Sequence, residues 1–133
     1  MKTIFKSVVL LLFGFVISSC VGPFTMENSG SSVNLGNDDP FEIELSGNPS
    51  TGYVWQVVSF DSTVIKQVGD PVYKASNDKI GSAGLYTFKF QTIADGQTNL
   101  LLVYKRKWEE HKLHDKTFKI KIVVGTMGRI LED

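Results

Sequence analysis

The chain has 133 residues, of which 42% are hydrophobic and 21% are charged. Its 14 basic residues balance its 14 acidic ones, which excludes the strongly basic surface expected of a nucleic-acid-binding protein. The single cysteine excludes an internal disulfide and a metal site built from several thiolates. The length and the aromatic content are typical of one folded domain with its own core.

The first twenty residues have the features of an export signal. Lys2 and Lys6 precede an apolar run at 8–17, which is shorter than the ~20 residues that a membrane-spanning helix needs. The run ends in the sequence Ile-Ser-Ser-Cys at 17–20, which resembles the lipobox of bacterial lipoproteins. That resemblance implies that cleavage leaves Cys20 as a lipid-acylated first residue. The alternative is an ordinary secretory signal that leaves Cys20 as a free thiol.

We therefore divide the chain into three parts. Residues 1–19 are predicted to be a lipoprotein signal peptide, residues 20–31 a flexible tether rich in Gly, Ser and Asn, and residues 32–133 the folded domain. We expect the mature protein to be an exported monomer, held on the cell envelope through Cys20. Val21 stands where many inner-membrane lipoproteins carry Asp, which favours the outer membrane or the cell surface.

The periodicity of the domain predicts strands throughout. In chain order they are expected at 32–35, 41–45, 54–60, 64–68, 72–75, 86–90, 98–104 and 118–124. The run 98–104 is almost wholly apolar and predicts a central strand buried on both faces. No helical stripe persists for three turns. Short strands separated by turn residues predict an all-β fold, specifically an immunoglobulin-like β-sandwich held by packing alone.

The sequence supplies little for catalysis. His111 and His114 lie in a charged stretch beside Asp115, where a solvated loop is favoured over a hydrolase triad or an incomplete zinc site. Ser76 and Lys79 match the Ser-x-x-Lys pattern of penicillin-binding enzymes, but the partner motifs of those enzymes are missing. We therefore expect no enzyme, no metal and no other cofactor.

Three segments between predicted strands have unusual composition. In the first, Pro49 fixes the backbone and Gly52 permits a left-handed turn. The second consists of small residues that let main chain approach a partner closely. The third offers an Arg and a Trp, which are enriched in binding hot spots. The candidate binding residues are Asn48, Pro49, Ser50, Thr51, Gly52, Tyr53, Gly81, Ser82, Ala83, Gly84, Arg106, Lys107 and Trp108.

Each segment also has a simpler interpretation. The first suits a plain β-turn, and the second suits a flexible hairpin end. Trp108 of the third suits a side chain folded onto the core. Together and in this order, however, the three segments resemble the motifs of the chagasin family of cysteine-peptidase inhibitors. Those motifs are Asn-Pro-Thr-Thr-Gly-Tyr/Phe, Gly-x-Gly-Gly and Arg-Pro-Trp/Phe.

The match has three departures from the family pattern. The first motif agrees at five of six positions, with Ser50 in place of a Thr. The second has Ala83 in place of a Gly, and the third has Lys107 in place of the Pro. We expect Ala83 to hinder the close approach of the second loop, and Lys107 to make the third loop less stiff.

The resemblance implies an immunoglobulin-like sandwich with three binding loops at one end. It implies reversible, tight inhibition of papain-like cysteine peptidases by a first loop that enters the active-site cleft. Thr51 would then lie nearest the catalytic cysteine, with the second and third loops on either side. Trp108 would stack on an aromatic wall of the cleft, and Arg106 would meet acidic or carbonyl groups there.

A second hypothesis belongs to a different functional class. An immunoglobulin-like envelope lipoprotein could bind glycans or other envelope components on an aromatic platform made by Tyr53, Trp55 and Trp108. The two hypotheses differ in where these rings lie. A platform needs them spread over a sheet face, whereas an inhibitor needs them at the end that bears the loops.

Overall fold

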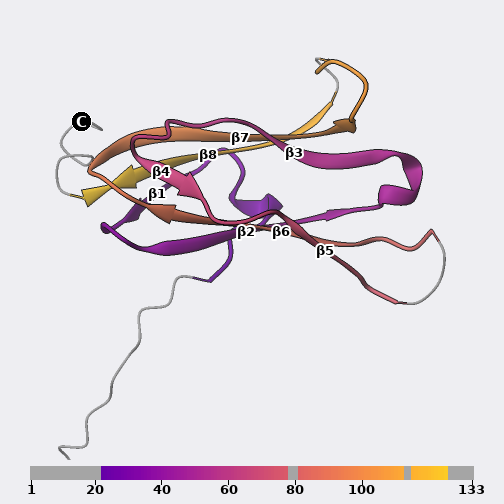
Figure 1. Cartoon of the computed structure of the whole chain (residues 1–133), viewed down its shortest axis with the longest axis horizontal. Helices are drawn as coiled ribbons and strands as arrows, with labels where there is room; N and C mark the ends of the chain where they lie inside the picture. Colours follow the sequence, from indigo (N-terminus) through magenta and orange to yellow (C-terminus); the bar gives the residue numbers. More distant parts are fainter. Residues whose placement is uncertain (1–21, 78–80, 113–114, 126–133) are drawn as a thin grey trace, which may run out of the picture.

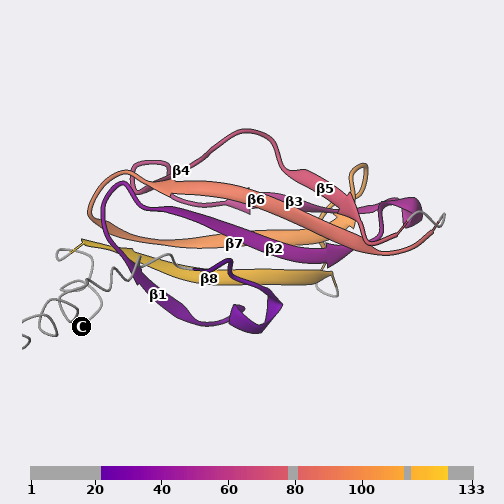
Figure 2. The same cartoon turned by 90° about the horizontal axis from the view of Figure 1, so that it is seen from below.

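The alternating apolar residues form two facing β-sheets in the computed structural model, which describes residues 22–77, 81–112 and 115–125. One sheet has the order β1-β8-β7-β3, and the other has the order β2-β6-β4, with β5 also paired to β6. Figures 1 and 2 show the two layers and their long axis. The strands are β1 (Ser32–Leu35), β2 (Pro40–Gly47), β3 (Tyr53–Ser59), β4 (Ile65–Gln67), β5 (Val72–Ala75), β6 (Gly84–Thr92), β7 (Gly96–Arg106) and β8 (Lys116–Val124).

The prediction of an all-β sandwich is confirmed. The structure also contains two short 3₁₀ helices, η1 (Met26–Asn28) and η2 (Pro49–Thr51). Most strand pairs are antiparallel, whereas β1 runs parallel to β8. No helix in the described part of the chain has the length and hydropathy to cross a membrane.

The core lies between the sheets and is made by alternate residues of each strand. Ile43 of β2 and Phe88 of β6 face Leu102 of β7 and Ile120 of β8, and all four are at most 1% exposed. Each such side chain stabilises the fold by about 1.5–3 kcal/mol when it is removed from water. The prediction for 98–104 was right about position and only partly right about burial, because on the outer face of β7 Val103 is fully buried whereas Asn99 is exposed.

The N-terminal boundary of the folded part differs from the expected residue 32. Phe24 is only 7% exposed and belongs to the core, where its ring meets that of Phe41 at 6.1 Å. Its backbone forms an isolated parallel bridge with Ile43. The arm continues through η1 into β1 along the edge of the sandwich (Figure 2). The Gly- and Ser-rich composition of residues 20–31 predicted a flexible tether, although Phe24 within it packs into the core.

The predicted signal peptide and Cys20 lie outside the described residues. The core itself extends from Phe24 to Val124. A chain that begins at Val21 therefore keeps every residue of the core.

Candidate functional site

Strand register brings three chain connections to one end of the sandwich. Gly47 at the end of β2 is opposite Gly84 at the start of β6, and Tyr53 at the start of β3 is opposite Arg106 at the end of β7. The β2–β3, β5–β6 and β7–β8 connections therefore all lie at this end (Figure 1). We call them the first loop (48–53), the second loop (81–84) and the third loop (106–112).

Asn48 organises the first loop through its side-chain oxygen and its backbone carbonyl. Its Oδ1 accepts hydrogen bonds from the Ser50 N–H at 3.1 Å and from the Ser50 hydroxyl at 2.6 Å. Its backbone carbonyl accepts the Thr51 hydroxyl at 2.7 Å. Because Ser50 and Thr51 bond within the loop, the single turn η2 is ordered before any partner arrives.

Gly52 ends this turn in the left-handed conformation, with φ of 87°. A side chain at this position would be strained, and its Cβ would lie 3.3 Å from Cη2 of Trp108. Gly52 is therefore required by its positive φ, and its lack of a side chain also lets the Trp108 ring lie close to the turn.

Tyr104 supports the first loop from behind, a role that sequence reasoning missed. Its hydroxyl accepts the Asn48 backbone N–H at 2.9 Å. Its ring lies 5.5 Å from the ring of Tyr53 and 5.2 Å from that of Trp55. Only the position of Tyr104 at the end of the apolar strand hinted at this contact. Gly47 permits it, since a Cβ there would lie 3.0 Å from the Tyr104 ring.

Tyr86 also lies close to Gly47. A Cβ at Gly47 would come within 2.8 Å of its ring. Burial is the main cause that raises the pKa of Tyr86, and the phenols of Tyr104 and Tyr73 add to it. The Tyr86 hydroxyl therefore stays neutral at physiological pH and can only donate or accept hydrogen bonds.

The second loop is joined to the first by the other end of the same amide. The Asn48 Nδ2 donates to the Gly81 carbonyl at 2.6 Å. Gly81 has a positive φ of 84°, whereas Ala83 does not, so its Cβ creates no backbone strain. The difficulty expected from Ala83 is therefore not one of backbone conformation.

Gly84 differs from the other predicted residues of the second loop because it is buried in β6. A Cβ there would lie 2.4 Å from the Lys74 carbonyl and 2.5 Å from the Tyr73 hydroxyl. Sheet packing thus explains this glycine. Gly81 and Ala83 are exposed, and Ser82 is half-buried.

The third loop packs on the first and carries its most exposed ring. The Arg106 guanidinium carbon lies 4.9 Å from the centre of the Tyr53 ring, a cation–π contact. Trp108 is 74% exposed, which excludes the simpler interpretation that it folds onto the core. Lys107 is exposed too, so its charge stays in solvent.

Local pairs close the third loop. The Glu109 N–H donates to the Arg106 carbonyl at 3.1 Å, and the Glu109 carboxylate lies 3.6 Å from Lys112 Nζ. His111 Nδ1 lies 3.4 Å from an Asp115 carboxylate oxygen, whereas His114 lies outside the described residues. Three or more His, Cys, Asp or Glu side chains placed to hold a metal are not found in the described ranges.

The position of Trp55 contradicts the hypothesis of a platform made by three exposed aromatic rings. It is only 4% exposed, and its Nε1 donates to the Ser46 carbonyl at 2.9 Å. Tyr53 is half-buried under Arg106. Of the three rings, Trp108 alone is strongly exposed, and it lies at the end that bears the loops. The described loops thus form one preordered projecting surface.

Comparison with known proteins agrees with this geometry. Residues 34–122 match the family model described as "Chagasin family peptidase inhibitor I42". Amoebiasin-1 of Entamoeba histolytica is 31% identical over 102 residues, which cover 75% of this chain and 96% of that protein.

Solved structures have the same fold. The cysteine protease inhibitor EhICP2 from Entamoeba histolytica superposes with a TM-score of 0.68 at 22% identity, over 78% of this chain and 95% of its own. PbICP-C, solved in complex with falcipain-2, superposes with a TM-score of 0.54 at 18% identity, over 84% of this chain and 96% of its own. At these identities the likeness concerns the fold alone.

Proposed function

This chain belongs to the chagasin family of peptidase inhibitors, and we propose that it inhibits papain-family cysteine peptidases by occluding their active-site cleft with its three loops. The family consists of inhibitors and not of enzymes. Inhibition is reversible and tight, because the protein binds without covalent chemistry through a surface that is already formed.

The observation that carries the proposal is the linkage of the three loops into one unit. Asn48 bonds to Gly81 of the second loop, and Gly52 lies against Trp108 of the third. A surface preordered in this way loses little conformational entropy when it docks, so more of the contact energy is expressed as affinity. The alternative of independent, flexible hairpin ends lacks this support.

Each loop has a distinct part in the proposed complex. The first loop enters the cleft, with Thr51 nearest the catalytic cysteine. The second lies along one side through main-chain contacts of Gly81 and its neighbours. The third lies along the other side, where exposed Trp108 stacks on an aromatic wall and Arg106 meets acidic or carbonyl groups.

The rigidity of the first loop also explains why the peptidase would not cleave it. Hydrolysis requires the scissile peptide to reach near-attack alignment with the thiolate. The turn at 49–51 is closed by bonds from Thr51 N–H to the Asn48 carbonyl at 3.2 Å and from Gly52 N–H to the Pro49 carbonyl at 2.9 Å. An extended substrate conformation would break both bonds.

The protein is further proposed to act at the cell envelope. The lipobox-like sequence at 17–20 supports acylation of Cys20, and the apolar run before it supports export. Several acyl chains anchor a protein firmly, since each buried CH₂ contributes about 0.8 kcal/mol. A monomer held in this way presents its loops to peptidases outside the cytoplasm.

The glycan-binding alternative has lost its main structural argument. Trp55 is buried, so the expected platform of three exposed rings does not exist. No other feature of the described residues favours it over inhibition.

The direct test is a titration of papain activity with a soluble chain that begins at Val21. We expect stoichiometric inhibition that is reversed on dilution, with the inhibitor recovered intact. Absence of inhibition of papain and of a small panel of related peptidases would reject the proposal. A Thr51→Trp variant should weaken inhibition strongly, because a bulky side chain at the tip blocks entry. Unchanged inhibition by that variant would reject the assignment of the first loop.

A further inference from the structure

The edge of β2 that faces away from β6 is only partly covered. Phe24 covers its first part, donating its N–H to the Glu42 carbonyl at 2.9 Å and accepting the Glu44 N–H at 2.8 Å. Alternate residues of a strand direct their backbone groups to the same side, so the backbone of Ser46 faces this edge as well. The Ser46 carbonyl accepts the Trp55 indole N–H. The Glu44 carbonyl and the Ser46 N–H have no partner among the described residues.

The N-terminal arm leaves these groups open because it turns away after Thr25. The Thr25 N–H donates to Asn28 Oδ1 at 2.8 Å, and the Asn28 N–H returns to the Thr25 carbonyl at 2.8 Å. This reciprocal cap starts η1 instead of a further strand residue. A gap therefore remains next to Glu44 and Ser46, on the line along which Phe24 is paired.

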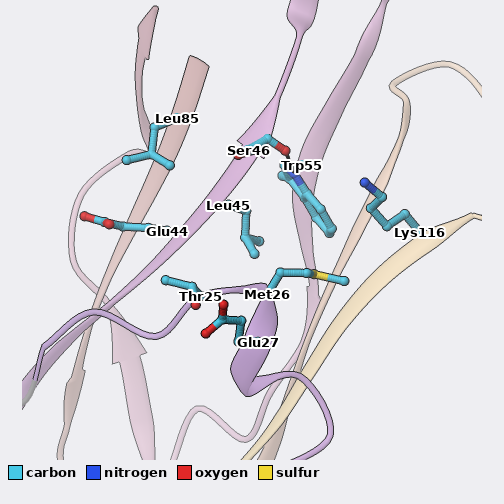
Figure 3. A pocket seen from close by; sticks show the side chains of 9 residues that line it. All are labelled: Thr25, Met26, Glu27, Glu44, Leu45, Ser46, Trp55, Leu85 and Lys116. Atoms are coloured by element: carbon cyan, nitrogen blue, oxygen red, sulfur yellow. Dashed lines mark hydrogen bonds between the residues drawn. The ribbon is translucent and has the colours of Figure 1, made fainter. Parts of the chain in front are cut away.

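The gap opens into a groove with a volume of about 460 Å³, which is within the ~300–1,000 Å³ usual for ligand sites. Its apolar lining consists of Leu45 and Trp55, which are almost fully buried, and of Met26 and Leu85, which are exposed (Figure 3). Met26 is 42% exposed and Leu85 is 37% exposed, so these two side chains supply the accessible apolar surface of the groove. The groove thus combines an apolar wall with two open backbone groups.

Charge is distributed unevenly around this groove. Figure 3 shows Glu27 and Glu44 on the side of Thr25, and Lys116 across from them beside Trp55. A positive group is therefore favoured at the Thr25 end and disfavoured at the inner wall. Because Thr25 also blocks the line of the strand at that end, an occupant must begin there and cannot pass through.

We propose that this groove binds the free N-terminus of an extended polypeptide with an apolar first residue. The first residue repeats the pairing of Phe24 two positions further along β2. Its ammonium group donates to the Glu44 carbonyl beside the two carboxylates, and its carbonyl accepts the Ser46 N–H. Its side chain then points inward, as that of Phe24 does, onto Leu45, Trp55 and Met26. This site uses none of the loop residues assigned to the peptidase.

The probe is the tetrapeptide amide Val-Ala-Ala-Ala, compared with the same peptide acetylated at its N-terminus. Titrations of the isotopically labelled chain from Val21 are followed by NMR. We expect saturable shifts of the Ser46 amide and the Trp55 indole N–H with the free peptide, and binding at least tenfold weaker after acetylation. Equal binding of both peptides, shifts elsewhere, or no saturable shift at millimolar peptide would overturn the proposal.

Two variants separate a specific site from general charge. Glu44→Gln should weaken binding of the free peptide at least fivefold and leave the acetylated peptide unaffected. Asp70→Asn is the matched control, because Asp70 is exposed and lies outside the groove. Equal weakening by both variants would mean that only the net charge of the protein attracts the ammonium group. Papain inhibition by the Glu44→Gln variant should be unchanged, which keeps this test distinct from that of the proposed function.

Discussion

Asn48 and Asp61 close the same kind of turn at opposite ends of β3. Asn48 Oδ1 accepts the N–H and the hydroxyl of Ser50, at 3.1 and 2.6 Å. Asp61 Oδ1 accepts the N–H and the hydroxyl of Thr63, at 2.9 and 2.6 Å. Both are side-chain-closed turns that the local sequence can form without help.

The surroundings of the two turns differ. The Asn48 turn is bonded to Gly81 and Tyr104 and lies against Trp108 through Gly52. The Asp61 turn has one contact of this kind, from its backbone N–H to the Thr98 hydroxyl at 2.7 Å. The difference teaches that the local turn provides order, whereas the neighbouring loops provide a binding surface.

Removal of the exposed neighbour of the Asn48 turn should have the largest effect. Trp108→Ala is expected to raise the inhibition constant for papain at least about 30-fold, because truncation of a hot-spot Trp costs 2 kcal/mol or more. The melting temperature should barely change, since the ring is 74% exposed. An unchanged inhibition constant would remove the third loop from the proposed interface.

The next effect tests the two turns directly. Asn48→Ala and Asp61→Ala should each lower the midpoint of urea unfolding, because each loses the side-chain bonds to the residue two positions on. Asn48→Ala also loses the bond to the Gly81 carbonyl. Only Asn48→Ala is expected to weaken inhibition, by about tenfold, since it also frees the second loop. If both variants weaken inhibition equally, the loss of inhibition reflects lower stability of the fold. The Asn48 turn would then have no special role in binding.

A smaller effect is expected from the support behind the first loop. Tyr104→Phe removes the hydroxyl that accepts the Asn48 N–H, a bond worth about 1 kcal/mol, or roughly fivefold in the inhibition constant. We also expect papain to cleave the first loop of this variant slowly, because the loop is less firmly held. Thr98→Val is the control, because it removes a hydroxyl that also accepts a backbone N–H, that of Asp61 at 2.7 Å, beyond the other end of β3. Identical behaviour of the two variants would contradict the supporting role of Tyr104.

The smallest expected effect is a dependence of stability on pH. It should occur at the Asp61 turn, whose side chain can ionise, and not at the Asn48 turn, whose side chain is neutral. Hydrogen bonds from the Thr63 hydroxyl and N–H lower the pKa of Asp61 below its ordinary value of 3.8. Because the folded pKa is the lower one, the stabilising effect is present above pH 3.8 and is lost as pH falls through the folded pKa.

The measurement is the melting temperature of the chain and of Asp61→Asn as a function of pH. The difference between them should be constant above the ordinary pKa of Asp61 and should change only below it. The neutral amide of Asn48 has no such dependence. A difference that varies with pH near neutrality would contradict this account.

The sequence predicted much of the fold because alternation is a local property. The strand at 72–75 and the short strand at 32–35 were predicted at their observed limits, and the paired sheets followed from the turn residues between strands. Phe24 was missed because one aromatic residue in a Gly- and Ser-rich segment has no periodicity. The glycan-binding hypothesis required Trp55 to be exposed, which is wrong because Trp55 belongs to the core between the sheets.

By itself the sequence determined the strands, the turn-forming residues and the motifs that place this chain among peptidase inhibitors. These follow from short-range rules, such as the restriction of φ by Pro49 and the freedom of Gly52. Only the tertiary structure decided that Asn48 joins two loops, that Tyr104 supports one of them and that Gly84 serves packing. The bonds that Asn48 makes to Gly81 and to Tyr104 link residues 33 and 56 positions apart in the chain, and strand register brings these residues within bonding distance.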